Sequence, residues 1–93
     1  MKSVLQKEKK CYVCGTTYNL HDHHIFFGTS NRKNSEKRGL KVWLCGHHHN
    51  LSNESVHFNK QFDNHLKTMA QRYYEEHYGT REDFRREFGK SYL

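Results

Sequence analysis

Ligands that bind soft metals occur as two pairs in the first half of the chain. Cys11-x2-Cys14 forms the first pair, and Cys45-x2-His48 forms the second. Structural zinc is typically held in a closed tetrahedron by four cysteine or histidine ligands from two such pairs. The 3 cysteines of the chain cannot all be joined in disulfides, which also favours metal binding. The spacing therefore predicts a structural zinc held by these four residues.

Further histidines surround this ligand set. His23 and His24 lie between the two pairs, and His47 and His49 flank His48. One of them could replace His48 as the fourth zinc ligand, or they could form a histidine-rich surface. An imidazole can also accept a proton from water near neutral pH or hold a divalent cation. Histidines left over beside a structural zinc are what a metal-assisted hydrolase requires.

The charge of the chain favours a polyanionic partner. Its formal net charge is +6, and its pI is about 9.3. Nucleic acid is the common partner of such a basic domain, so we expect DNA binding. Five basic residues in and after the predicted loop are expected to bind the phosphate backbone: Arg32, Lys33, Lys37, Arg38 and Lys41. The alternative is a loop whose charged side chains are only exposed to solvent. We see no apolar run of signal-peptide or membrane-span length, so we expect a soluble, intracellular protein with no membrane partner.

The first half of the chain predicts a β-hairpin. Only 33% of the 93 residues are apolar, so a single small domain of this kind usually needs a metal or disulfides to stabilise it. Residues 1–10 are polar and lysine-rich, which favours a short helix or a frayed arm. One strand is expected over residues 18–27, ending near the histidine pair, and a second over 40–44. The polar residues 28–39 between them are expected to form a long loop.

The second half of the chain predicts helices. A short helix is expected over residues 45–51, beginning at the metal. An amphipathic helix should begin after Asn59, a suitable N-cap, and run to about Tyr78. Thr80 and Asp83 have the spacing of a capping box and predict a short final helix.

The residues L-x-D-H-H-I followed by L-C-x-x-H-H resemble the HNH nucleases of the ββα-metal, or His-Me finger, superfamily. The resemblance is to small phage-type members whose core is held together by a structural zinc ion, and it covers roughly residues 11–51. It implies an α+β fold in which a zinc-stapled ββα-metal core carries the C-terminal helices of residues 59–93 packed on it. The whole chain, residues 1–93, would then be one nuclease domain.

The resemblance also implies roles for the remaining histidines. The first residue of the family's pair is a catalytic-metal ligand, which corresponds to His23, and the second is the general base, which corresponds to His24. The histidine after the last zinc ligand is the second catalytic-metal ligand, which corresponds to His49. The implied function is a divalent-metal-dependent endonuclease that hydrolyses DNA phosphodiester bonds. With imidazole ligands the catalytic cation could be Mg²⁺, Mn²⁺, Ni²⁺ or Zn²⁺.

The chain departs from the family pattern in two places. The last residue of the second zinc pair is His48, where the family has a cysteine. The family's middle asparagine, which braces the loop that orients the base, is missing from its expected place, where residues 39–41 stand. Asn34 lies earlier in the predicted loop.

Two further residues near the predicted site have open roles. Asp22 could orient a histidine or could be a solvated turn residue. His57 could add a metal ligand, contact phosphate, or pack with its neighbours.

Other functions fit parts of this pattern. A zinc ribbon or treble-clef module that binds nucleic acid without cutting it would have the same zinc ligands, but no use for His23, His24 and His49. A histidine-rich metal buffer would bind several zinc ions and no DNA. The nuclease interpretation adds a cytoplasmic location in a bacterial host, a phage or prophage origin, and either a homodimer or other phage or host proteins as partners.

Overall fold

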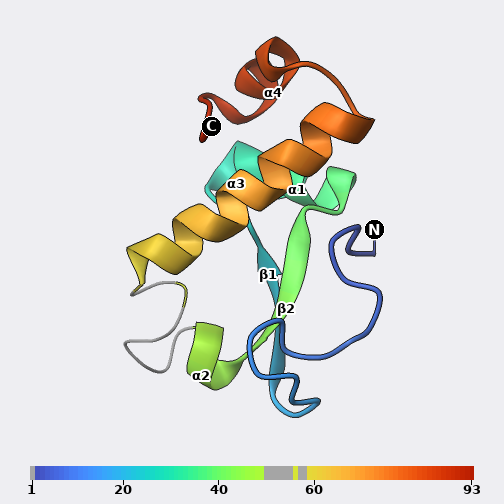
Figure 1. Ribbon diagram of the computed structural model, residues 1–93, viewed down its shortest axis with the longest axis vertical. Helices are drawn as coiled ribbons and strands as arrows, with labels where there is room; N and C mark the ends of the chain where they lie inside the picture. The colour runs from blue at the N-terminus through green and yellow to red at the C-terminus, as the bar shows by residue number, and fades with distance from the viewer. Residues whose placement is uncertain (1, 50–55, 57–58) are drawn as a thin grey trace.

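The computed structural model describes residues 2–49, 56 and 59–93 and has an α+β fold (Figure 1). Its elements in chain order are β1 (Leu20–His24), α1 (Thr29–Arg38), β2 (Lys41–Cys45), α2 (Gly46–His49), α3 (Lys60–His77) and α4 (Arg81–Phe88). No helix among the described residues combines the length and the apolar composition needed to cross a membrane. The predicted α+β class, with a hairpin followed by helices, is therefore confirmed.

The two strands form an antiparallel pair that fixes which histidines share a face. Leu20 pairs with Cys45 at one end, and His24 pairs with Lys41 at the other. Because side chains alternate along a strand, His21 and His23 project to one face of β1, and His24 projects to the opposite face.

The connection between the strands differs from the expected loop, because residues 29–38 form the helix α1. Its sequence contains no apolar residue, so it has no hydrophobic periodicity to reveal a helix. Polar contacts with α4 hold it instead. The side-chain amides of Asn31 and Asn34 donate to the backbone carbonyls of Phe88 and Glu87, and Arg38 forms a two-point ion pair with Glu87.

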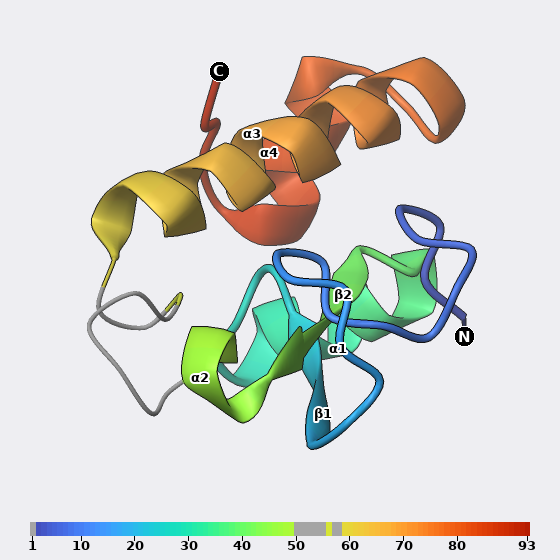
Figure 2. The ribbon, with the colours of Figure 1, turned by 60° about the horizontal axis from the view of Figure 1, so that its bottom comes forward.

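The two C-terminal helices form as predicted and close the core. The Asn59 side chain accepts a hydrogen bond from the Phe62 N–H at the start of α3, and Thr80 and Asp83 form a complete capping box on α4. In Figures 1 and 2, α3 crosses one side of the hairpin, while α4 lies at the end where α1 is found. The core is formed mainly by the hairpin, the residues that flank its strands, α3 and α4. Its largest fully buried apolar side chains are Phe26, Phe84, Ile25, Leu40, Leu44 and Leu66.

The N-terminal segment is neither a helix nor a frayed arm. It runs beside β2, where the Val4 N–H donates to the Gly39 carbonyl at 2.9 Å and the Gln6 side chain accepts from the Trp43 N–H at 2.7 Å. Gly39 has a left-handed backbone with φ of 70°, and an added Cβ would lie 2.6 Å from the Lys2 carbonyl oxygen. This close approach requires glycine, and it shows that the arm is an integral part of the packed structure.

Candidate functional site

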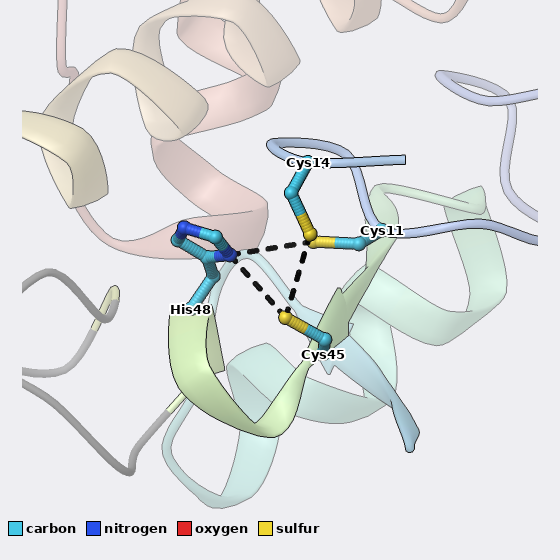
Figure 3. A group of neighbouring side chains, drawn as sticks. All are labelled: Cys11, Cys14, Cys45 and His48. Atoms are coloured by element: carbon cyan, nitrogen blue, oxygen red, sulfur yellow. Dashed lines mark hydrogen bonds between the residues drawn. The ribbon is translucent and has the colours of Figure 1, made fainter. Parts of the chain in front are cut away.

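The four predicted zinc ligands converge at one end of the hairpin (Figure 3). Cys11 and Cys14 lie on the turn before β1, Cys45 ends β2, and His48 lies on α2. One ligand atom from each residue lies within 4.8 Å of the others. This Cys3His cluster, which we call the thiolate cluster, could hold a structural metal ion.

The separations within the thiolate cluster fit zinc. Bond lengths of about 2.3 Å to sulfur and about 2.1 Å to nitrogen in a tetrahedron put two sulfurs about 3.8 Å apart, and sulfur and nitrogen about 3.6 Å apart. The Sγ atoms of Cys14 and Cys45 are 3.8 Å apart. The Nδ1 atom of His48 lies 3.3 Å from the Cys45 Sγ and 3.7 Å from the Cys11 Sγ. The donor set and these three separations therefore suit a structural zinc.

Backbone hydrogen bonds lower the pKa of one thiol of the cluster, whereas burial raises the pKa of the Cys45 thiol. Burial acts to raise the pKa of the Cys11 thiol, but backbone hydrogen bonds at Cys14, Cys45 and Val13 outweigh it, and the pKa falls from 9.0 to about 6. The Tyr12 N–H donates to the Trp43 carbonyl and ties this turn to β2. Because zinc binds the thiolate form, a lowered thiol pKa favours metal binding.

A second group of histidines lies where β1 meets α2. The Nδ1 atoms of His21 and His49 are 2.7 Å apart, and the rings of His23 and His49 have centroids 5.3 Å apart. Two imidazoles bound to one cation at about 2.1 Å have ring centroids roughly 4.5–5.5 Å apart. His23 is only 3% exposed. His21, His23 and His49 thus form a second group of neighbouring imidazoles, in which the His21 ring contacts that of His49.

His24 faces the other side of β1 and belongs to a network of charges. Its Nε2 lies 3.1 Å from the carboxylate of Glu36 on α1. The Lys41 ammonium lies 2.9 Å from both oxygens of Glu36 and 3.1 Å from the carboxylate of Asp22. His24 is thus separate from the thiolate cluster, and a charged partner holds its ring.

Asp22, His24 and Glu36 also have the spacing of a metal-binding group. Lys41 already supplies a positive charge between the two carboxylates, with its ammonium side chain only 10% exposed. A divalent cation at this position would have to displace that ammonium. We therefore interpret this group as an ionic network around His24 and not as the site of a catalytic cation.

The three histidines to which the sequence resemblance gives catalytic roles share a pocket. His23, His24 and His49 line a pocket of about 270 Å³ together with Arg32. Arg32 and His24 also line an adjoining hollow of about 700 Å³, whose other lining residues are Lys33, Glu36 and Lys37. Side chains from opposite faces of β1 thus meet in one pocket because it lies where the strand ends.

The predicted DNA-binding residues divide into two groups. Arg32, Lys33 and Lys37 are exposed on α1, beside His24. Arg38 is held by Glu87, and Lys41 is held by the ionic network around His24. These two cations have intramolecular partners, whereas Arg32, Lys33 and Lys37 form an exposed basic surface beside His24.

Two residues near the predicted site, Glu36 and His21, were not predicted from the sequence to contact its histidines. The contact between Glu36 and His24 could not be foreseen while residues 28–39 were expected to be a loop. His21 could have been found from the two-residue period that places it on the face of His23. His57 lies outside the described residues, so its role stays a prediction.

No family model matches the chain, and neither a curated protein nor a solved structure resembles it closely enough to count as a match.

Proposed function

We propose that this protein is an HNH-type endonuclease that hydrolyses DNA phosphodiester bonds with the help of a divalent cation. The observation that carries the proposal is the pocket lined by His23, His24 and His49 together. A zinc module that only binds nucleic acid would not need three imidazoles around one pocket beside its structural metal. In this proposal β1, β2 and α2 form a ββα-metal core, and α1 is inserted between the strands.

His24 acts as the general base in this proposal. It accepts a proton from a water molecule as the water oxygen forms a bond to phosphorus. The bond between phosphorus and the 3′ oxygen breaks, and the leaving oxygen takes a proton from solvent. The products are a 5′-phosphate and a 3′-hydroxyl. A positioned base of this kind typically contributes about 10²–10⁴-fold to the rate.

The residues around His24 bind the substrate and balance its charge. A divalent cation held by His23 and His49 would supply positive charge for the scissile phosphate and the leaving oxygen. Arg32, Lys33 and Lys37 grip the backbone on the adjoining surface, and they carry no sequence information by themselves. The thiolate cluster fixes the turn before β1 against α2 and so holds His49 opposite His23.

The second cation site provides a test of this proposal. Zinc-loaded protein should bind one further Mn²⁺ or Ni²⁺ ion per chain, measured by calorimetry. The His23→Ala and His49→Ala variants should weaken this binding by at least tenfold, because each removes an imidazole ligand. Both variants should keep their structural zinc, because neither histidine belongs to the thiolate cluster.

The matched control is His65→Ala, which removes an exposed imidazole from α3. It should bind the added cation like the wild-type protein. Tight DNA binding without any second cation would favour the non-catalytic zinc module, and binding of several zinc ions without DNA would favour a metal buffer.

A further inference from the structure

We infer that Glu36 is a positioning residue for the general base, an inference that rests on the proposed function. Its carboxylate accepts a hydrogen bond from the Nε2–H of His24. The ring is thereby held with Nδ1 as the nitrogen that takes the proton from water.

The geometry around Glu36 suits this role. The Glu36 oxygen lies 3.1 Å from the His24 Nε2, and the Lys41 ammonium lies 2.9 Å from each Glu36 oxygen. Lys41 is itself 8% exposed and is the cross-strand partner of His24. With both oxygens engaged by Lys41, the carboxylate is held in one orientation toward the imidazole.

The hydrogen bond determines which ring nitrogen can act as a base. A neutral imidazole has one nitrogen that donates and one that accepts. A carboxylate can only accept, so its partner Nε2 carries the hydrogen and Nδ1 keeps the lone pair. The same carboxylate stabilises the positive charge that develops on the ring when Nδ1 takes the proton, as carboxylate partners of catalytic histidines do.

Asp22 and Lys41 adjust the charge of this network. The Lys41 ammonium bridges Asp22 and Glu36, so both carboxylates face a fixed positive charge. Without Lys41, the two carboxylates would repel an incoming phosphate from the side of the pocket that His24 lines.

The kinetics of Glu36 variants on a labelled duplex test the inference. Glu36→Ala should lower kcat about 10- to 100-fold, the usual cost of removing the partner of a functional histidine. The KM for DNA should stay equal or fall, because the lost negative charge lies beside Arg32 and Lys33. Glu36→Gln should retain more of the wild-type kcat, because its amide oxygen can still accept from Nε2.

Two controls separate positioning from a structural effect. Glu76→Ala, which removes an exposed carboxylate from α3, should leave kcat and KM unchanged. In a His24→Ala background, adding Glu36→Ala should change the residual rate less than twofold, because its effect passes through His24. Zinc content and the far-UV spectrum should match the wild type in every variant.

The outcomes that overturn the inference differ from those that overturn the proposed function. A wild-type kcat in Glu36→Ala, or an equal loss of rate in the His24→Ala background, would show that Glu36 does not act through the base. If the wild-type protein cuts no DNA with any cation, the proposed function fails, and the inference fails with it.

Discussion

Replacing His24 with alanine should lower kcat for duplex cleavage by about 10²–10⁴-fold, the contribution expected of a general base. The KM for DNA should change little, because the exposed cations of α1 remain in place. Zinc content should also be unchanged, since His24 is not part of the thiolate cluster. Steady-state cleavage of a fluorescent duplex, with zinc determined by mass spectrometry, measures all three quantities.

The control for this variant is His65→Ala, which removes an imidazole of equal size from the exposed side of α3. It should cut at the wild-type rate. A His24→Ala protein that also cuts at that rate, with normal zinc content, would mean that another group activates the water.

Loss of a buried cysteine of the thiolate cluster should unfold the protein. Cys11 is 1% exposed and Cys45 is 7% exposed, and both are predicted to bind the zinc that joins the N-terminal turn to the end of β2. Structural zinc sites contribute about 10–16 kcal/mol in zinc-finger peptides. That exceeds or equals the total stability of most small domains, about 5–15 kcal/mol. Cys11→Ser and Cys45→Ser should therefore lose both zinc and helical signal in far-UV circular dichroism.

A neighbouring pair of histidines tests the identity of the fourth ligand. His48→Ala should lower the zinc affinity and the melting temperature, whereas His47→Ala, at an exposed position of α2, should leave both near the wild-type values. The reverse result would move the fourth ligand to His47 and require a different arrangement of α2.

The sequence predicted the elements that have a hydrophobic period or a capping signal. The four-residue and three-residue spacing of apolar side chains located α3, and the Thr80–Asp83 pair located the start of α4. The four residues of the thiolate cluster could be predicted because the spacing of zinc ligands is set by metal geometry and not by the rest of the fold. The histidine pair on β1 was placed correctly at the end of its strand.

The parts that the sequence did not predict depend on contacts between distant residues. Helix α1 is held by Asn31, Asn34 and Arg38 against the end of α4, and none of these contacts leaves a local pattern in the sequence. The arm of residues 2–10 follows β2 because groups far apart in the sequence pair with each other, as in the backbone hydrogen bond between Val4 and Gly39. The first of these errors hid the surroundings of His24, because Glu36 lies on α1.

The most direct test of the nuclease assignment is the relaxation of a supercoiled plasmid by the zinc-loaded protein. The reaction is run without added cation and with Mg²⁺, Mn²⁺ or Ni²⁺. We predict that nicked circles accumulate only when a cation is added, with ends that carry 5′-phosphate and 3′-hydroxyl groups. A correctly folded protein that retains the plasmid in a mobility shift, yet leaves it supercoiled with every cation, would contradict the nuclease assignment.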